Sequence, residues 1–240
     1  MKDLLDVHMH TLASGHAYNT IREMIAAGSK KGLALVGIAD HAPAMPGSTH
    51  RFYFENLRIF DRKVYGDEAG VELLMGVELN ILNTTGKVDL EEKALRSVDY
   101  AIASLHDPCI NPGTELDSTT AIMSAMWIPQ VKIIGHPDNP VFPVDFDKIA
   151  KAAKERHVLL ECNNSSYRRG ASRSGSRDLA KKMLQACKKY GTHVIMGSDA
   201  HIDLDVGNHA LSEEVIREAD FPEELVINSS PEKFKEWIRA

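Results

Sequence analysis

Seven histidines and two carboxylates of this chain stand just past the ends of apolar runs that have the composition of buried strands. Imidazole and carboxylate groups are common ligands of transition metals in proteins. On a strand, residues two apart share a face, so His8 and His10 can bind one ion while Val7 and Met9 pack behind them. The nine candidate ligands are His8, His10, His16, His41, Glu78, His106, His136, Asp199 and His201. As a set they predict a site for more than one metal ion.

The chemistry of such a site follows from its ligands and their charge. Nine ligands are too many for one ion and enough for two or three ions that share a carboxylate and water. Neutral imidazole suits zinc, and also iron or manganese where carboxylates join. Two carboxylates cannot neutralise several divalent ions, so the site should attract an anion with several oxygens, and a phosphate ester fits best. Metal ions also provide hydroxide at neutral pH and stabilise the attacking and leaving oxygens. The residues therefore predict hydrolysis of a phosphate ester, for which we expect a phosphomonoester attacked by a metal-bound hydroxide, with a phosphodiester as the alternative.

Alternating strands and helices must position these ligands. Eight apolar runs show little alternation of polar and apolar residues, as expected for strands covered on both faces in a parallel sheet. They are Leu4–His8, Leu33–Ile38, Val71–Val77, Tyr100–Leu105, Val131–Ile134, Val158–Glu161, Val194–Met196 and Leu225–Ile227. Helical patterns lie between them. Thr20 and Glu23 can cap Ile21–Lys31, Asp145 can cap Phe146–Arg156, Gly191 can end Ser176–Lys189, and Ser230-Pro231 opens Glu232–Arg239.

This alternation leaves an open doubly wound sheet or a closed α/β barrel as the fold. In an open sheet only the strand ends near the crevice converge, whereas in a barrel all carboxyl ends face one mouth. Ligands at nearly every strand end therefore favour the barrel. No linker, repeat or low-complexity segment divides the chain, so residues 1–240 are predicted to form one domain. The longest irregular stretch, Ala42–Arg51, follows His41 and is expected to form a wall or lid of the site.

Composition and charge indicate which partners and which cellular location the protein is expected to have. The formal charge of −6 argues against a nucleic-acid groove, since phosphate backbones are held mainly by dense Lys and Arg. Met1–Leu5 lacks the apolar run of a signal peptide, and no apolar stretch approaches the roughly 20 residues of a membrane helix. Cys109, Cys162 and Cys187 are widely spaced, which fits reduced thiols. We therefore expect a cytoplasmic protein that neither enters a membrane nor binds nucleic acid.

Three polar residues outside the ligand set are candidates for further roles. Arg168 and Arg169 follow a predicted strand end and could hold a phosphate by bidentate hydrogen bonds, the alternative being a solvated loop. Asp40 precedes a ligand, where it is either a proton shuttle or partner of that ligand, or an orienting or helix-capping carboxylate.

For five other polar residues we predict no direct role in catalysis, although one of them could line the pocket. Asn163, on the same strand face as Glu161, is predicted to be structural. His50, in the irregular segment, could line the pocket. His157, His193 and His209 do not stand just past the end of a predicted strand, so we interpret them as histidines that bind no metal.

Six short motifs resemble those of the polymerase and histidinol phosphatase (PHP) family. In chain order they are His8-Met9-His10-Thr11, Ala39-Asp40-His41, Gly76-Val77-Glu78, Ser104-Leu105-His106, Gly135-His136-Pro137 and Gly197-Ser198-Asp199-Ala200-His201. The resemblance runs from about residue 3 to residue 230 in the family's order. The chain length, the Glu161–Ser166 segment and the segment after His41 are most similar to the stand-alone YcdX-type phosphatases of that family.

The resemblance implies a distorted (β/α)7 barrel, similar to a TIM barrel, with three divalent metal ions, usually zinc and sometimes iron or manganese. It implies a first ion held by His8, His10, Glu78 and Asp199. It implies a second ion held by His106, His136 and the shared Glu78, and a third held by His16, His41 and His201. We predict as catalytic residues Asp199, Glu78 and Asp40, and as substrate-binding residues Arg168 and Arg169. The run Leu225–Ile227 exceeds seven strands and is expected to be an extra strand or an edge piece.

Three other functions remain open at this point. A nuclease of the same family would use the same ions on a phosphodiester and would need a basic track beside the mouth. An amidohydrolase shares the His-x-His pattern but usually has a bridging modified lysine, and here Glu78 fills that position while no lysine stands at a strand end. A metal-storage or scaffold module would saturate its metals, whereas ligands at a barrel mouth leave positions open to substrate.

Overall fold

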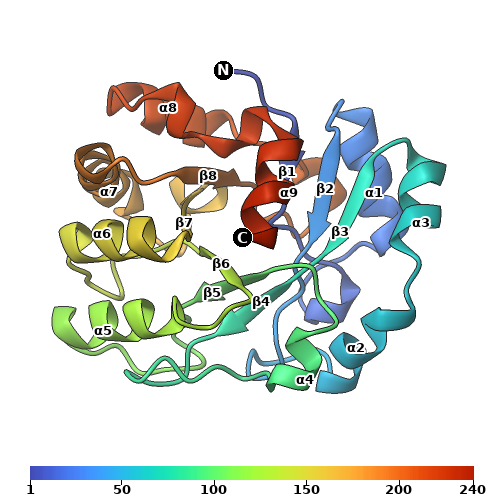
Figure 1. The fold of residues 1–240 in the computed structure, drawn as a ribbon, viewed down its shortest axis with the longest axis horizontal. Helices are drawn as coiled ribbons and strands as arrows, with labels where there is room; N and C mark the ends of the chain where they lie inside the picture. Colours follow the sequence, from blue (N-terminus) through green and yellow to red (C-terminus); the bar gives the residue numbers. More distant parts are fainter.

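The computed structural model describes residues 1–240 and shows strands that alternate with helices along the chain (Figure 1). The strands are β1 (Leu5–Asp6), β2 (Leu35–Ile38), β3 (Glu72–Met75), β4 (Val77–Asn80), β5 (Ala101–Ser104), β6 (Val131–Ile134), β7 (Leu159–Asn163) and β8 (Val194–Gly197). The helices are α1 (Ile21–Lys30), α2 (Arg51–Asn56), α3 (Arg62–Ala69), α4 (Glu92–Leu95), α5 (Glu115–Ala125), α6 (Phe146–Arg156), α7 (Ser176–Tyr190), α8 (Ala210–Glu218) and α9 (Pro231–Arg239). The predicted α/β class is confirmed.

All strand pairs within the two sheets are parallel, in the order β1-β2-β3 in one sheet and β4-β5-β6-β7-β8 in the other. Only Gly76 separates β3 from β4, so these two strands are halves of one bent strand. A Cβ at position 76 would lie 2.5 Å from the ring of Tyr100, which explains why glycine stands at the bend. Counted in this way, the protein has the seven strands that the PHP resemblance implies.

Isolated bridges join the two sheets at two places, one from the segment after β2 to β4 and one between the segments that follow the edge strands β1 and β8. One parallel bridge pairs His41 with Glu78, and the other pairs Met9 with Ala200. At the second seam the N–H of His10 donates to the carbonyl of Ala200 at 2.8 Å. No continuous ladder closes either seam, so the arrangement is a distorted, TIM-barrel-like one. Because the bridges lie at the carboxyl ends of the strands, they bring the ligand-bearing segments together.

The segment after α8 is not an extra strand, and it pairs with the sheet through a single bridge at its edge. Leu225–Ile227 falls across two short 3-10 turns, and only Val226 forms a bridge, with Val194. The side chain of Asn228 takes the place of ladder hydrogen bonds between β1 and β8. Its amide accepts from the N–H of Met196 at 2.8 Å and donates to the carbonyl of Leu5 at 3.1 Å. The one amide thus forms hydrogen bonds with both strands.

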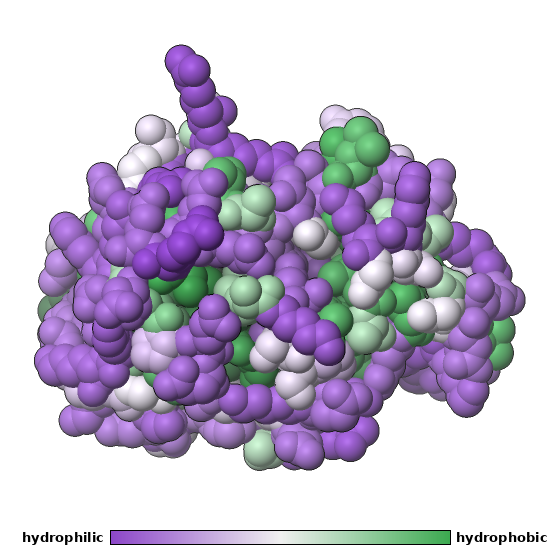
Figure 2. Space-filling view, turned by 90° about the horizontal axis from the view of Figure 1, so that it is seen from above, coloured by the Kyte–Doolittle hydropathy of each residue, from purple (hydrophilic) through white to green (hydrophobic).

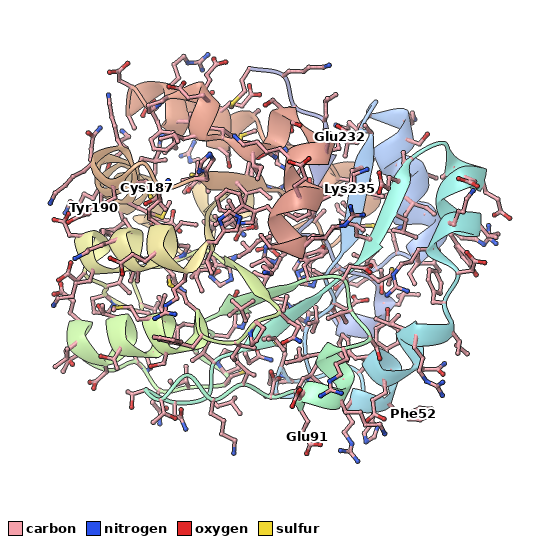
Figure 3. The ribbon with its side chains drawn as sticks, viewed as in Figure 1. Phe52, Glu91, Cys187, Tyr190, Glu232 and Lys235 are labelled. Carbon is pink, nitrogen blue, oxygen red and sulfur yellow. The ribbon has the colours of Figure 1, made fainter.

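The interior of the barrel is filled by apolar side chains and covered at one end by α9. Twelve buried residues form this interior cluster, and Phe234 and Trp237 of α9 belong to it. A larger core of 51 buried residues lies between the strands and the outer helices. Figure 1 shows α9 in front of the strands at the centre of the molecule. Lys235, labelled in Figure 3, ties α9 to β3 through an ion pair with Glu72 at 2.7 Å.

The helix ends follow the predicted capping chemistry. Thr20 and Glu23 form a capping box at the start of α1. Asp145 accepts a hydrogen bond from the N–H of Lys148 at the start of α6. Gly191 ends α7 with φ 66°, in the left-handed region that glycine adopts most easily. Local sequence therefore determines these boundaries to within a residue.

The face of the molecule seen in Figure 2 is mainly hydrophilic. Figure 2 shows hydrophobic side chains only in small separated areas between charged and polar ones. None of the helices has the length and apolar character that crossing a bilayer would require. All three cysteines are free thiols, and two of them, Cys162 and Cys187, are buried.

A buried charge cluster fixes the N-terminal strand to the loop before α8. The ring of His209 lies 2.7 Å from an oxygen of Asp3 and 3.5 Å from an oxygen of Asp6. Asp6 also accepts from the N–H groups of Ser198 and Gly207. Burial would lower the pKa of His209, but Asp6 and Asp3 raise it to about 10.

This raised pKa predicts a pH dependence of stability. An unfolded histidine has a pKa of about 6.5, so protonated His209 stabilises the fold fully below about that pH. The contribution is lost as pH rises through the folded pKa of about 10. We expect the free energy of unfolding to fall more steeply over this range in wild type than in His209→Gln, by urea unfolding at several pH values. His50→Gln, a change at an exposed histidine, should keep the wild-type slope. Equal slopes in wild type and His209→Gln would contradict the assignment.

Candidate metal centre

The nine predicted ligands converge on one place at the carboxyl ends of the strands. The carboxylate of Glu78 is the centre of the group, because ring nitrogens of five histidines lie between 2.8 and 3.6 Å from it. These histidines are His8, His10, His41, His106 and His136. Each comes from a different strand end, apart from the pair on the segment after β1. The structure therefore assembles in space side chains that lie far apart along the chain.

Asp199 forms a second centre beside the first. Its Oδ1 lies 3.2 Å from Nε2 of His10, 3.7 Å from Nε2 of His8 and 3.6 Å from Nδ1 of His201. His16 is exposed at the rim, and its ring stacks on those of His41 and His201 at 4.9 and 4.8 Å between centroids. All nine predicted residues thus belong to one cluster.

The cluster has the chemistry and spacing that metal ions require. Zinc bonds of about 2.0–2.1 Å at a tetrahedral angle place two ligand atoms roughly 3.4 Å apart. Nε2 of His8, Nε2 of His10, Nδ1 of His41, Nδ1 of His136 and Oε2 of Glu78 are buried without a hydrogen-bond partner. Such groups are costly to bury unless something else satisfies them. Three overlapping ligand sets can each hold an ion: His10, His41 and His201; His8, His10 and Glu78; and His41, Glu78 and His106.

Several histidines are oriented through the ring nitrogen that faces away from the cluster centre. Nδ1 of His8 lies 2.6 Å from Oε1 of Glu161, and Nδ1 of His106 lies 2.7 Å from Oδ1 of Asn80. Such contacts fix the ring and its tautomer, so the opposite nitrogen keeps its lone pair for a metal. In both histidines the nitrogen left for the centre is Nε2.

Asp40 orients the site through an intermediary and does not face the cavity. It is buried and accepts hydrogen bonds from the N–H and hydroxyl of Thr11, the hydroxyl of Ser14 and the hydroxyl of Tyr53, at 2.7 to 2.9 Å. Ser14 in turn contacts Nδ1 of His10 at 3.1 Å. Both carboxylate oxygens are thus occupied by donors. Of the two roles open from the sequence, this geometry favours the orienting carboxylate over the proton shuttle.

Gly197 and Gly135 belong to two of the motifs, and at both positions a neighbouring side chain occupies the space that a Cβ would need. A Cβ at position 197 would lie 2.0 Å from Oε1 of Glu161. A Cβ at position 135 would lie 2.2 Å from the hydroxyl oxygen of Ser104, which donates to Glu78 at 2.6 Å. The backbone close to both glycines is also unusual. His136 and Asp199 have φ values of 31° and 54°, a region where such residues are rare and which is often associated with functional sites.

The buried charges of the site support one another. Burial would raise the pKa of Glu78, but His106, His8 and His41 hold it well below its usual range. Burial also favours the neutral form of His10, and together with the charges of His41 and His201 it holds the pKa of His10 well below normal. These shifts favour an ionised Glu78 and a neutral His10, the forms that bind metal. At His8 burial would lower the pKa, but Glu161, Glu78 and Asp199 raise it well above its usual range.

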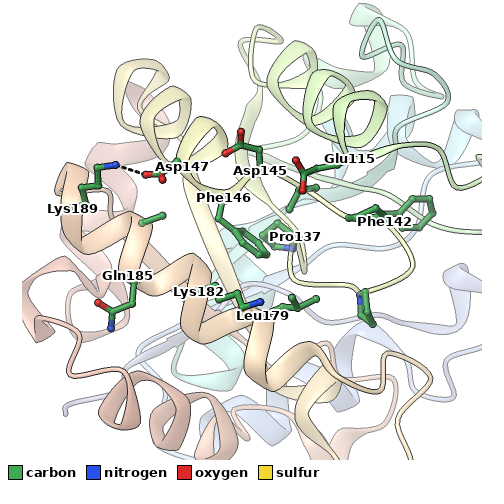
Figure 4. Close-up of a pocket in the computed structure, with 14 residues that line it drawn as sticks. Glu115, Pro137, Phe142, Asp145, Phe146, Asp147, Leu179, Lys182, Gln185 and Lys189 are labelled. Atoms are coloured by element: carbon green, nitrogen blue, oxygen red, sulfur yellow. Dashed lines mark hydrogen bonds and ion pairs between the residues drawn. The ribbon is translucent and has the colours of Figure 1, made fainter.

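A cavity of about 280 Å³ opens onto the cluster. Besides seven of the predicted ligands its lining is mostly polar and includes Asp107, Asn139, Ser165, Ser172 and Arg173. A larger pocket of about 830 Å³ lies elsewhere, between α6, α7 and the loop after β6, and contains none of the nine ligands (Figure 4). There Lys189 pairs with Asp147 at 2.7 Å. The small polar cavity, not the larger pocket, therefore adjoins the chemistry.

The cationic side chain at this cavity is Arg173, not Arg168 or Arg169. Arg173 lies 2.7 Å from Oδ2 of Asp199 and is largely buried. Arg168 is held by Asp205 at 2.8 Å, and neither Arg168 nor Arg169 lines the cavity. The loop from Arg168 to Gly175 carries several arginines, and sequence alone did not reveal which one turns inward.

Two further predictions concern Asn163 and His50. Asn163 contacts Glu161 at 3.1 Å and Asp199 at 3.3 Å, so it supports the site from behind, in keeping with a structural role. His50 does not line the cavity. It is exposed and caps α2 by accepting from the N–H of Phe52. The suggestion that His50 lines the pocket was wrong, because the irregular segment turns it toward solvent.

Sequence reasoning missed the residues that hold the ligands from behind. Glu161, Asn80 and Ser14 each contact one ring nitrogen of a predicted ligand. A signal for Glu161 was present, because a charged residue within a buried strand is rare unless it is paired.

Comparison with known proteins places these observations in a family. The sequence model of the PHP domain family matches residues 6–167. A protein of Clostridium acetobutylicum named probable phosphatase is 44% identical over 100% of this chain and 96% of its own length. Another protein of that name, from Caldicellulosiruptor saccharolyticus, is 45% identical over 98% of this chain and 95% of its own length.

Solved structures show the same fold at low sequence identity. The histidinol phosphate phosphatase of Lactococcus lactis, in complex with zinc, L-histidinol and phosphate, has a TM-score of 0.61 at 15% identity, covering 92% of this chain and 95% of that one. A candidate histidinol phosphatase of Listeria monocytogenes has a TM-score of 0.65 at 16% identity, covering 86% of this chain and 98% of that one. With its motifs, its fold and its full-length relatives, this chain belongs to the PHP family.

Proposed function

We propose that the protein is a metal-dependent phosphatase that hydrolyses small phosphomonoesters. The observation that carries the proposal is the cluster of seven histidines around two buried carboxylates, open to a small polar cavity. Relatives of nearly equal length are named probable phosphatases, and a structural neighbour binds zinc and phosphate. A phosphodiester in a nucleic-acid chain would need a larger cavity than this one of about 280 Å³. It would also need a basic track beside the cavity.

We propose three divalent ions in the cluster, with zinc as the main metal and iron or manganese as alternatives. His8, His10, Glu78 and Asp199 would hold the first. His106, His136 and the shared Glu78 would hold the second, and His16, His41 and His201 the third. In support, His8, His10 and Glu78 lie together in one of the sets that can hold an ion, and His41 and His201 share another. When bound, such ions stabilise negative phosphate oxygens and make hydroxide available at neutral pH.

The chain's own side chains hold the substrate. Arg173 is the guanidinium at the cavity, and its planar donors suit two phosphate oxygens. In the structure it is paired with Asp199, which holds it ready at the edge of the cluster. Ser165, Ser172 and Asn139 add polar groups around the cavity for the rest of the substrate. The polar lining supports a small hydrophilic leaving group.

We further propose that residues 1–240 act as one PHP domain in the cytoplasm. The family model ends at residue 167, yet Asp199 and His201 lie beyond it and belong to the same cluster. β8, which precedes them directly, pairs with β7, and Ala200 bridges to Met9 at the start of the chain. Reduced cysteines fit the cytoplasmic location.

Metal binding should stabilise the protein through the cluster. We expect zinc to raise the melting temperature of metal-free wild-type protein by several degrees, because only the folded chain gathers the ligands. His10→Ala should lose most of that increase, while His50→Ala, at an exposed histidine, should keep it. Differential scanning fluorimetry with and without zinc measures the shift. An equal shift in His10→Ala and wild type would rule out the proposed cluster.

A hydrolysis assay tests both the proposed substrate class and the role of Arg173 in binding phosphate. With zinc or manganese, wild type should release phosphate from p-nitrophenyl phosphate and leave single-stranded DNA intact. Arg173→Ala should lower kcat/KM by about 10- to 100-fold, mainly through KM, because a charge-assisted pair contributes about 1.5–3 kcal/mol. Arg168→Ala and Arg169→Ala are the matched controls and should stay within about threefold of wild type. Cleavage of DNA without release of phosphate from monoesters would instead favour the nuclease.

A further inference from the structure

Glu161 of β7 is a buried carboxylate at the site that faces the backs of the ligands. We propose that Glu161 is a positioning residue: it sets the tautomer of His8 and holds the backbone of His136, and it thereby sets the metal affinity of the centre. The inference rests on the proposed function, because it assumes that His8 and His136 are ligands.

The two oxygens of Glu161 have separate tasks. Oε1 lies 2.6 Å from Nδ1 of His8. Oε2 accepts from the backbone N–H of His136 at 2.8 Å and from the amide of Asn163 at 3.1 Å. Oε2 receives two N–H donors and therefore acts as an acceptor, and we infer that Oε1 also accepts, from Nδ1 of His8. All three contacts are buried, where a hydrogen bond to an ionised group is stronger than in water.

The contact with His8 determines which nitrogen can bind a metal. A carboxylate that only accepts requires the proton of a neutral His8 ring to lie on Nδ1. Nε2 then keeps its lone pair, and it points toward Glu78 and Asp199 at 3.5 and 3.7 Å. Nε2 has no hydrogen-bond partner in the protein. Glu161 therefore presents His8 to the centre in its ligating form.

The contact with His136 supports an unusual backbone. His136 has φ 31°, a conformation that costs energy for a residue with a side chain. The hydrogen bond from its N–H to Glu161 holds the chain at this turn, and the ring is then aimed at Glu78 at 3.2 Å. One carboxylate thus orients two ligands, one through its ring and one through its backbone.

The surrounding structure is built to admit this carboxylate. Gly197 leaves the space that Oε1 occupies, since a Cβ there would lie 2.0 Å from it and 3.0 Å from Cβ of His8. Gly197 stands directly before the segment that carries Asp199. The glycine and the glutamate therefore form one unit from neighbouring strands.

Replacing Glu161 by glutamine tests whether the charge of the side chain orients the ligands or whether its size alone matters. The carbonyl oxygen of the introduced glutamine would have to take the Oε2 position, because two N–H groups point at it. Its amino group would then face Nδ1 of His8 and force that nitrogen to accept. The ring proton would move to Nε2, where it blocks a metal. Glu161→Gln keeps the size of the side chain and should still lose metal, whereas Glu161→Asp keeps an acceptor-only group and should lose less.

The experiment measures metal content and zinc affinity of the full-length protein. We expect Glu161→Gln to bind zinc about 10- to 100-fold more weakly than wild type in competition with a chelator, as for other groups that orient ligands. Elemental analysis after dialysis should then find fewer ions per chain in Glu161→Gln. Glu161→Asp should fall between the two, and Glu155→Gln, at an exposed position of α6, should match wild type. Wild-type zinc affinity in folded Glu161→Gln would overturn the proposal.

A second measurement on wild type does not depend on the folding of any variant. Nitrogen-15 NMR of histidine-labelled, zinc-loaded protein should show His8 protonated at Nδ1 and ligated through Nε2. Ligation through Nδ1 would overturn the proposal. These readouts concern metal binding alone, so they remain valid if the wild-type protein hydrolyses no phosphate ester, which would refute the proposed function instead.

Discussion

The structure depends on the burial of Glu78 among five imidazoles. A carboxylate taken out of water loses several kilocalories per mole of solvation unless charged or polar partners replace the water. In this protein the partners are ring nitrogens from separate strand ends and the hydroxyl of Ser104. These partners come from the ends of four strands, β1, β2, β5 and β6, so the strands have to converge on one point. A barrel-like arrangement of parallel strands provides that convergence, and an open sheet does not.

This requirement shapes the backbone as well as the side chains. The glycines at 76, 135 and 197 each leave room for a ring, hydroxyl or carboxylate that would otherwise collide with a Cβ. His136 and Asp199 follow two of these positions with positive φ, so the chain turns sharply as it leaves β6 and β8. Such conformations persist only where surrounding contacts compensate for them. The many hydrogen bonds at Glu161 and the bridge between Met9 and Ala200 supply that support.

Much of the fold and the ligand set could be predicted from the sequence, because both are local patterns. Apolar runs indicated the strands, capping residues indicated the helix ends, and ligands at nearly every strand end indicated convergence. Whether each of the nine residues binds metal is still a prediction, although the structure brings them together. The positions of Asn80, Ser14 and Glu161 behind the ligands depend on contacts between distant segments, which no local pattern records. The same limit explains why Arg173 was missed within an arginine-rich loop, and why Asn228 instead of a strand joins β1 to β8.

Glu78 and Glu161 show how one residue type performs two tasks within one barrel. Both are buried glutamates close to His8 and His136. Glu78 faces Nε2 of His8, Nε2 of His10 and Nδ1 of His41, which have no hydrogen-bond partner, and its own Oε2 has none either, so these atoms are available to metal ions. Glu161 faces Nδ1 of His8 and the backbone of His136, so its oxygens are already saturated by donors. The sequence singled out Glu78 as a ligand but gave no task to Glu161, because contacts with the back of a ring depend on segments that are distant in the chain. The difference lies in which side of the imidazole ring each carboxylate meets. A carboxylate on the side of the ring that faces the centre can bind the same ion as the ring, whereas one on the opposite side makes the ring a better ligand.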